Sequence, residues 1–295
     1  PGAGPRRGAQ LWRHHLQLRR QLFWRHRQRP RLLWANPSRP FAFGQNGAGE
    51  QGNNTLNVSN LVPTAILKTG VLANKTVVAL SAGANHSLAL CSDGTLAAWG
   101  ANLYSQLADG STTDRRVPVL SNTSAIPAPH RIVAISSGQR FNLALASNGR
   151  VLTWGAGDFG QIGNNSNNGR STPQFVTTTG AFSGKTAVAV AAGHSHSLAL
   201  CADGTVVAWG NNNAGQVGAG SSTTQILLPV LVTTSGALAG KTVVAIAAGH
   251  FHSLALCSDG TFAAWGWNAY GQLGINSTTS SLEPVLVNTT GALAG

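Results

Sequence analysis

Two short histidine motifs have the residue types and spacing that most resemble a chemical site. His194 and His196 are separated by one residue, as are His250 and His252. Side chains at positions i and i+2 of a β-strand lie on one face, so each pair would present two imidazoles together. Two such pairs offer the nitrogen ligands that zinc and copper accept.

The same histidines recur at a fixed place in a longer repeat, which favours a structural role. His86, His196 and His252 occupy equivalent positions, and Phe141 fills that position in another copy. A position that accepts either His or Phe is typical of packing and hydrogen bonding. We therefore expect these histidines to be part of the framework, and we expect no bound metal.

The cysteines also recur at a fixed position of the repeat, which again favours a structural role. Cys91, Cys201 and Cys257 share one repeat position, with Ala146 as the fourth occupant. Tolerance of Ala indicates a small buried side chain rather than a nucleophile. Equivalent points of neighbouring sheets should lie roughly 10 Å apart, whereas a disulfide needs Cα atoms within about 7 Å. We therefore expect three unpaired thiols.

The acidic residues give no candidate for acid–base catalysis. Asp93, Asp203 and Asp259 each precede a Gly, and Asn148 takes the same place in another copy. Asp-Gly and Asn-Gly are strong signals for tight β-hairpins. No pair of carboxylates is left for general acid–base chemistry, so the sequence predicts a protein that is not an enzyme and uses no cofactor.

A Trp-Gly pair marks the repeat that must position all these residues. The pairs begin at Trp99, Trp154, Trp209 and Trp265, at spacings of 55, 55 and 56 residues, and Phe43 fills the same position 56 residues earlier. Within the copy that ends at Trp265, three apolar segments are separated by turn residues, and they predict strands over 243–248, 253–257 and 261–265. The run 229–233 predicts a fourth strand. Four strands in each repeat indicate the blades of a β-propeller.

The repeat resembles that of the regulator of chromosome condensation (RCC1) family. The stretch GKTVVAIAAGHFHSLALCSDGTFAAWG and the following WNAYGQLG carry the resemblance, and related stretches recur along residues 44–295. The resemblance implies an all-β fold, a β-propeller of RCC1-type four-stranded blades. With four full repeats and a partial fifth, we expect it to be incomplete. The predicted units are 44–99, 100–154, 155–209, 210–265 and the partial unit 266–295.

The near-identity of the units is most similar to long bacterial members of the family. This likeness implies a bacterial cell-envelope or secreted protein. The sequence lacks Met, even at position 1, and its last residue falls in mid-repeat. We therefore expect the chain to be a fragment of a longer protein.

Residues 1–43 differ sharply from the rest of the sequence. They contain ten Arg and no Asp or Glu, whereas residues 44–295 have a net charge of only +2 out of the +12 of the whole chain. One interpretation is a basic arm that binds nucleic acid or an anionic membrane, and a second is an organelle-targeting segment. The third, which we favour, is a frame-shift artefact. In each case we expect little ordered structure, and nucleic acid is a partner only if the arm is genuine.

The loops that follow the Trp-Gly pairs are the best candidates for binding. The residue directly after each pair, and the residue three places later, change from copy to copy while the frame around them does not. Loops on a rigid scaffold often carry function, and aromatic residues are strong contact anchors. The predicted partner-binding residues are Tyr104, Phe159, Trp267 and Tyr270.

These features predict a non-enzymatic protein-binding scaffold that uses loops on the faces of the propeller. Two alternatives come from the resemblance. One is a guanine-nucleotide exchange factor for a small GTPase, and the other is a secreted enzyme inhibitor or adhesin-type binder. The identity of the protein partner stays open.

Overall fold

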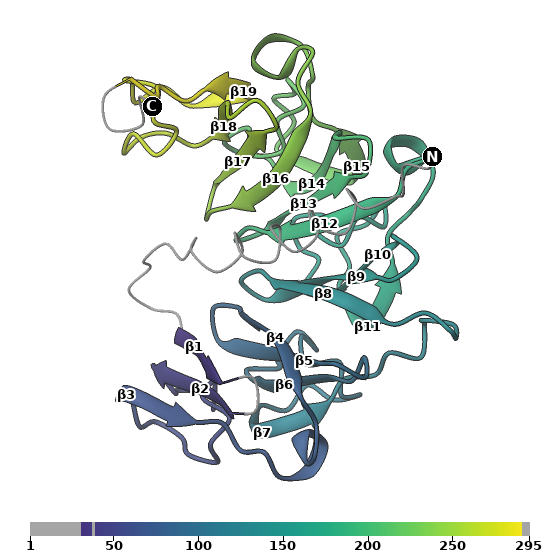
Figure 1. Cartoon of the computed structure of the whole chain (residues 1–295), viewed down its shortest axis with the longest axis vertical. Coiled ribbons are helices and arrows are strands. Elements are labelled where there is room, and N and C mark those ends of the chain that lie inside the picture. The colour runs from purple at the N-terminus through teal and green to yellow at the C-terminus, as the bar shows by residue number, and fades with distance from the viewer. Residues whose placement is uncertain (1–30, 37–38, 291–295) are drawn as a thin grey trace, which may run out of the picture.

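The computed structural model describes residues 31–36 and 39–290, and this part of the chain consists almost entirely of short antiparallel strands. Its nineteen strands form five sheets, the first with three strands and the others with four. The sheets follow one another along an open arc, from the purple first sheet to the yellow last sheet (Figure 1). The prediction of an all-β, incomplete propeller is confirmed.

Within each sheet, the strands are hydrogen-bonded in the order in which they occur in the chain. The first three sheets contain β1 (Arg31–Asn36), β2 (Arg39–Gly44) and β3 (Asn60–Ala65); β4 (Val77–Ala82), β5 (His86–Cys91), β6 (Leu96–Gly100) and β7 (Arg115–Leu120); and β8 (Ile132–Ser137), β9 (Phe141–Ala146), β10 (Val151–Gly155) and β11 (Arg170–Phe175). The last two contain β12 (Ala187–Ala192), β13 (His196–Cys201), β14 (Val206–Asn211) and β15 (Gln225–Leu231); and β16 (Val243–Ala248), β17 (His252–Cys257), β18 (Phe262–Gly266) and β19 (Ser281–Leu286).

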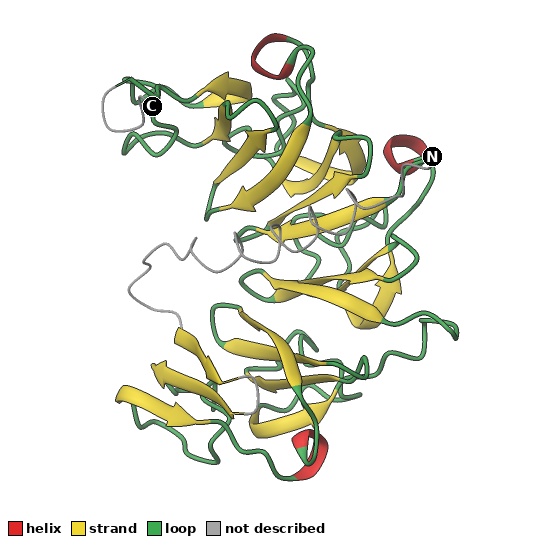
Figure 2. Ribbon diagram, in the orientation of Figure 1, coloured by secondary structure: helices red, strands yellow, loops and turns green. Residues whose placement is uncertain are grey.

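Three single turns of 3-10 helix are the only helical elements of the described residues: η1 (Gly70–Leu72), η2 (Gly180–Phe182) and η3 (Gly236–Leu238). They lie in the connections between sheets, as Figure 2 shows in red. The described residues contain no helix that is long and apolar enough to cross a membrane.

Each four-stranded sheet combines parts of two predicted repeat units. Its first three strands end at a Trp-Gly pair, and its fourth strand comes after the following loop, so the second sheet runs from Val77 to Leu120. Residues 1–30 of the predicted basic segment lie outside the described residues. Residues 31–36 and 39–43, for which the sequence predicted little ordered structure, form β1 and most of β2, and β2 pairs with both β1 and β3.

Glycine is required in the Trp-Gly pair because the backbone turns there. Gly100 has φ of 100°, and the pairing of β6 with β7 shifts register between Ala98 and Gly100. A Cβ atom on Gly100 would lie 2.5 Å from the carbonyl oxygen of Asn85. An L-residue therefore meets both a disfavoured φ and a backbone clash at this point.

The tryptophans of the pairs lie between successive sheets. Trp99, Trp154, Trp209 and Trp265 are completely buried. Each indole Nε1–H donates to a backbone carbonyl in the loop of the preceding sheet, at 2.7 to 2.9 Å; the acceptors are Glu50, Gln106, Gln161 and Gln216. The repeated Trp thus supplies apolar area and a fixed bond between neighbouring sheets.

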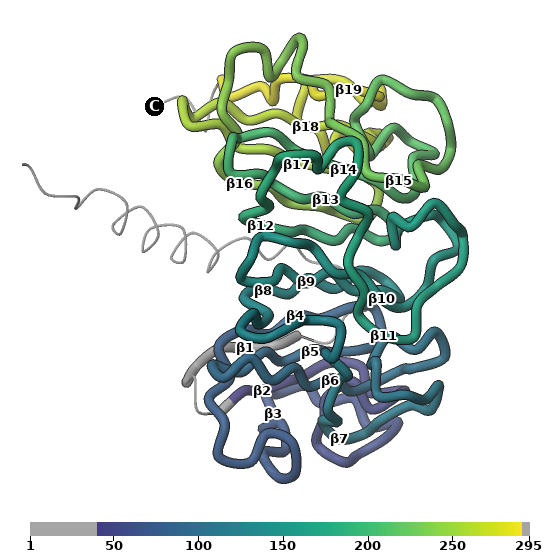
Figure 3. Tube along the Cα trace, turned by 90° about the vertical axis from the view of Figure 1, so that its right-hand side faces the viewer, coloured from purple at the N-terminus to yellow at the C-terminus, as the bar shows by residue number. Residues whose placement is uncertain are grey.

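Apolar side chains fill the space between each pair of neighbouring sheets. Leu88 of β5, Ile132 of β8 and Trp154 of β10 belong to one such cluster, between the second and third sheets. The other three clusters fill the remaining three spaces. Figure 3, turned by 90° from Figure 1, shows each sheet beside the sheets that precede and follow it in the chain. The propeller core is therefore a series of inter-sheet layers.

The fourth strands form the outer edges of the sheets, and each contains a proline. β15 starts at Gln225 and ends at Leu231, whereas the sequence predicted a strand over 229–233. Its register shifts between the partners of Ala208 and Gly210, in the stretch that contains Pro229. Proline is tolerated on an edge strand because its missing N–H would face solvent, and it also discourages edge-to-edge association.

Candidate partner-binding loops

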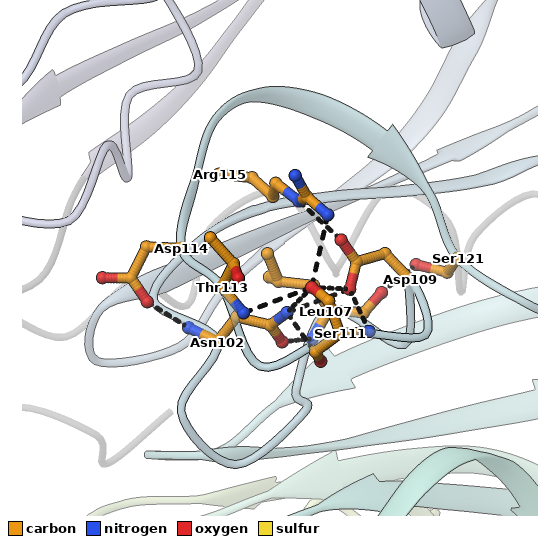
Figure 4. Close-up of polar contacts among 8 residues, drawn as sticks. All are labelled: Asn102, Leu107, Asp109, Ser111, Thr113, Asp114, Arg115 and Ser121. Atoms are coloured by element: carbon orange, nitrogen blue, oxygen red, sulfur yellow. Dashed lines mark hydrogen bonds and ion pairs between the residues drawn. The ribbon is translucent and has the colours of Figure 1, made fainter.

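The loops after the Trp-Gly pairs are organised by a repeated asparagine. Asn102 is completely buried, and its Oδ1 accepts the backbone N–H of Leu107 at 3.0 Å. Its Nδ2 donates to Asp109 Oδ1 and to the carbonyl of Ser111, both at 3.0 Å (Figure 4). Asn46, Asn212 and Asn268 accept the equivalent backbone N–H in their own loops. An asparagine at the same repeat position therefore fixes the backbone of four of the loops.

An ion pair completes this network in the second sheet. Asp109 accepts from Asn102 and Ser111 and pairs with Arg115 Nε at 2.6 Å (Figure 4). Burial would raise the pKa of Asp109, but the hydrogen bonds from Ser111 and Arg115 outweigh it and lower that pKa. The carboxylate is thus held ionised as a structural anchor of the loop.

A second set of side chains positions the variable residues directly. The side-chain oxygen of Gln106 accepts the backbone N–H of Tyr104 at 2.9 Å, and Gln161 accepts that of Phe159 at 2.8 Å. Gln272 does the same for Tyr270 at 2.9 Å. The backbone under each variable side chain is fixed in this way, so the loops present different side chains in a constant geometry.

The turns between the first two strands of each sheet lie beside these loops. The backbone N–H of Ala101 donates to the carbonyl of Asn85, and that of Trp267 donates to the carbonyl of Phe251. The turns of successive sheets are also hydrogen-bonded to one another, since Gln139 N–H donates to the His194 carbonyl at 3.0 Å. We call this surface the loop face. It comprises the loops 45–52, 101–108, 156–163, 211–218 and 267–274 and the turns 84–85, 139–140, 194–195 and 250–251.

Tyr104, the first predicted binding residue, is engaged by the next sheet. The Arg140 guanidinium lies over the Tyr104 ring, 4.4 Å from its centroid, and also donates a hydrogen bond to the phenol oxygen. Tyr104 is half-buried as a result. Leu103 beside it is 70% exposed and was not among the predicted residues.

Phe159 and Tyr270 occupy the same loop position as Tyr104 but have different surroundings. Phe159 is half-buried, whereas Tyr270 is 84% exposed. Trp267 contacts Tyr270 edge to face, with ring centroids 5.1 Å apart and planes at 84°. The last sheet therefore has the most open aromatic group of the loop face.

A row of rings continues from these two residues into the neighbouring turns. Phe251 meets Trp267 at 5.9 Å and 86°, and His250 meets Phe251 at 4.0 Å and 74°. His250 in turn lies 3.8 Å from His194 of the preceding sheet. We call these five residues the aromatic row: His194, His250, Phe251, Trp267 and Tyr270. Only Trp267 and Tyr270 were predicted as binding residues: His194 and His250 were considered as metal ligands, and Phe251 was not singled out, although the turn residues vary between copies as the loops do.

The histidine motifs are divided between two environments. His194 and His250 belong to the aromatic row, whereas His196 is completely buried on β13 and lies 3.0 Å from Ser253 Oγ of the next sheet. Burial, and then repulsion by His252, lowers the pKa of His196 to about 3. Among the described residues, no group of three or more His, Cys, Asp or Glu side chains could hold a metal ion.

The recurring cysteines and aspartates have framework positions. Cys91, Cys201 and Cys257 are buried, free thiols at the ends of equivalent strands, and burial raises the pKa of each. Asp93 and Asp203 lie in hairpin turns, and hydrogen bonds from Lys75 and Lys185 lower the pKa of each carboxyl to about 2. The two carboxylates also accept the backbone N–H groups of Thr95 and Thr205 and so stabilise their turns.

Successive four-stranded sheets, a tryptophan bond between neighbours and variable loops on one face define a repeat β-propeller. The family model for the RCC1-like domain matches residues 33–293. The chain belongs to the RCC1-like domain family.

Curated relatives agree with this assignment. The ultraviolet-B receptor UVR8 of Arabidopsis thaliana is 36% identical over 216 residues, which cover 73% of this chain and 47% of the receptor. The E3 ubiquitin-protein ligase HERC2 of Homo sapiens is 32% identical over 250 residues, 84% of this chain and 5% of the ligase. The chain thus spans about half the length of the first relative and a small part of the second.

Solved structures share the fold. Human WBSCR16 matches with a TM-score of 0.76 and 23% identity, over 88% of this chain and 65% of that chain. Prp20p of Saccharomyces cerevisiae matches with a TM-score of 0.72 and 20% identity, over 86% and 60% of the two chains. At these identities the likeness concerns the fold alone.

Proposed function

We propose that this protein is a non-enzymatic scaffold that binds a partner protein through its loop face. One observation carries the proposal. The side chains that vary between repeats, Tyr104, Phe159, Trp267 and Tyr270 among them, gather on a face whose backbone is fixed by repeated Asn and Gln hydrogen bonds. A preorganised backbone lowers the entropic cost of binding, and Trp and Tyr are enriched among the residues that anchor protein interfaces.

Two solved structures with the same fold also concern protein binding. One structure shows yeast RCC1 (Prp20) bound by Kap60, and another study of Prp20p concerns its binding to Gsp1p and histones. For the present chain, these relatives support a propeller that serves as a docking platform for other proteins.

Quantitative affinity capture tests the proposal. The full chain and the double variant W267A/Y270A are used as baits, with Leu61→Ala as the matched control. Leu61 is 92% exposed on β3, the outer strand of the first sheet. We expect partners that are retained by the wild type and by Leu61→Ala and reduced at least about tenfold by the double variant. Equal recovery by all three baits would contradict the proposal.

A guanine-nucleotide exchange factor is the second candidate, because the fold is shared with Prp20p, whose binding to Gsp1p has been studied. Release of a labelled guanine nucleotide from a panel of small GTPases tests it. Acceleration by the wild-type chain, lost in W267A/Y270A, would support exchange activity through the loop face. No acceleration across the panel removes this candidate and leaves the scaffold proposal standing.

A further inference from the structure

The hairpins between the second and third strands of the four-stranded sheets lie at the end opposite to the loop face. In the third sheet, for example, β9 runs from the turn 139–140 of the loop face to the hairpin 147–150. The first residue of each hairpin donates its backbone N–H to the residue directly before the inner strand, as Ser147 does to Arg131 at 2.8 Å. We call this surface the hairpin face. It comprises the hairpins 92–95, 147–150, 202–205 and 258–261 and the segments 75–76, 130–131, 185–186 and 241–242.

In three of these sheets, a repeated ion pair neutralises the hairpin end. A lysine two residues before the inner strand pairs with the aspartate of the hairpin, and the pairs are Lys75 with Asp93, Lys185 with Asp203 and Lys241 with Asp259. Threonine follows the lysine and also follows the Asp-Gly pair in all three sheets, at Thr76, Thr186 and Thr242 and at Thr95, Thr205 and Thr261.

The third sheet differs from the others at all four of these positions. His130 stands in place of the lysine, and Asn148 stands in place of the aspartate. The two threonines are replaced by Arg131 and Arg150, and both arginines are exposed. The carboxylate of the hairpin is thus absent from this sheet, and two guanidinium groups are added.

Both arginines are held in place by contacts on the two sides of the hairpin. The Arg131 side chain packs on Gly94 of the preceding sheet, where an added Cβ atom would lie 3.0 Å from the Cβ atom of Arg131. The Arg150 guanidinium lies over the ring of Phe175 on β11, 3.7 Å from its centroid. Side chains that are already ordered lose less entropy when they bind a ligand.

The distribution of charge makes this hairpin end a narrow positive patch. Residues 115–157 contain five Arg and no Asp or Glu. Among the described residues, no carboxylate forms an ion pair with Arg131 or Arg150. The hairpins of the second and fourth sheets, on either side, carry Asp93 and Asp203, whose side chains are 49% and 47% exposed. The patch is therefore basic in its centre and bordered by acidic groups.

We propose that the hairpin end of the third sheet binds a short acidic segment of a partner protein through Arg131 and Arg150. The guanidinium group matches the geometry of a carboxylate and binds it with two parallel hydrogen bonds. A long nucleic-acid strand fits less well, because its phosphates would continue past the patch toward Asp93 or Asp203. Single-strand sites also use aromatic rings for stacking, whereas Arg150 covers the Phe175 ring.

The test uses short, fluorescently labelled Gly/Ser peptides that carry several glutamates or, in the matched control, the same number of glutamines. Fluorescence anisotropy with the full chain at low salt should show tighter binding of the glutamate peptide. Arg131→Thr and Arg150→Thr should each weaken it about threefold, and the double variant about tenfold. Both substitutions introduce the residue that the other sheets carry at the same position, so the fold should be retained.

Two further variants make the comparison specific. Arg116→Ser removes an exposed arginine of β7 that lies beside Gly49 in a loop of the loop face, and it should leave binding unchanged. Asn148→Asp introduces the carboxylate of the other hairpins and should weaken binding about threefold. Equal affinity for the glutamate and glutamine peptides would overturn the proposal, as would a loss in Arg116→Ser as large as that in Arg131→Thr.

The position of the bound peptide is determined separately, because the ten arginines of residues 1–43 also attract acidic groups. A glutamate peptide with a photoreactive benzophenone is crosslinked to the wild-type chain, and mass spectrometry locates the modified residues. We expect crosslinks within 128–131 or 146–151. Crosslinks confined to residues 1–43 would overturn the proposal, as would a single-stranded oligonucleotide that displaces the peptide from this site and binds there more tightly.

The hairpin face and the loop face are separate surfaces, so this proposal goes beyond the proposed function. Affinity capture with W267A/Y270A reports on the loop face, and the glutamate peptide reports on the third hairpin. Either proposal can therefore fail while the other stands.

Discussion

The indole Nε1–H of Trp209 donates a 2.8 Å hydrogen bond to the backbone carbonyl of Gln161, in the loop of the preceding sheet. The same carbonyl accepts the hydroxyl of Ser197 at 3.0 Å. The Gln161 side chain, in turn, accepts the backbone N–H of Phe159. One residue thus connects the buried tryptophan layer to a variable position of the loop face, which explains how core packing fixes the geometry of the loops.

Trp209→Phe is expected to lower the free energy of unfolding by about 2 kcal/mol. The substitution removes one buried hydrogen bond and leaves a gap beside Phe182, which packs on Trp209 at 5.9 Å. Urea unfolding followed by circular dichroism measures the change. Trp267→Phe is the matched control, and because its ring is half-buried on the loop face it should change stability by less than about 0.5 kcal/mol. If both substitutions lowered the free energy of unfolding equally, the hydrogen bond from Trp209 to the Gln161 carbonyl would not be a main contact between neighbouring sheets.

His196→Phe is expected to reduce the dependence of stability on pH. Burial lowers the pKa of His196 in the folded protein from 6.5 to about 3. Below pH 6.5 the unfolded chain takes up a proton that the folded chain does not, so the contribution of the neutral imidazole, fully present above 6.5, is lost as pH falls toward 3. Phe141 fills the equivalent position in the third sheet, so the ring is expected to fit.

Urea midpoints of the wild type and of His196→Phe at about pH 7.5 and pH 4.5 test this prediction. The wild type should lose more stability between the two pH values than the variant does. A constant difference between the two proteins would show that His196 is not held neutral by the fold.

Asn102→Ala should loosen the second loop and destabilise the protein by about 2 kcal/mol, because it leaves the buried N–H of Leu107 without its acceptor. Asn122→Ala is the control, since the exposed Asn122 side chain accepts the backbone N–H of Ser124 in its own turn, and the substitution keeps the backbone bond from Asn122 N–H to the Ala108 carbonyl. Hydrogen–deuterium exchange over residues 101–115 should rise in the first variant alone. Unchanged exchange in Asn102→Ala would mean that the loop is held by other contacts.

The three thiols should be unreactive in the folded protein. Cys91, Cys201 and Cys257 are buried, and burial raises the pKa of each, which lowers the thiolate fraction. A thiol reagent at mildly alkaline pH should react slowly with the native protein and with all three cysteines in urea. Rapid reaction of one native thiol would place that residue at an exposed site.

The strands of each blade were predictable because their signals are local. The strand predicted over 243–248 matches β16, and those over 253–257 and 261–265 match β17 and β18 within one residue. The edge strand β15 begins four residues earlier than predicted, since its pairing continues through a register shift before Pro229. Such a shift depends on the partner strand and leaves no mark in a hydrophobic pattern.

Contacts between sheets were beyond the sequence signal. The bond from Trp209 to Gln161 joins residues 48 positions apart, and the contact of His194 with His250 joins equivalent turns of two repeats. The repeat predicted that each residue has counterparts in other copies, but it did not say which counterpart faces which. For the same reason, Tyr104 and Tyr270 looked equivalent in sequence, although Arg140 covers only the first.

Site-specific photo-crosslinking tests the binding of a partner to the loop face most directly. A photoreactive phenylalanine analogue is placed at Tyr270 in one variant and at Leu61, on the outer strand of the first sheet, in another; both native side chains are largely exposed. With the partner obtained by affinity capture, we predict a crosslinked product from position 270 and none from position 61. A product of equal yield from both positions, or from position 61 alone, would contradict the account.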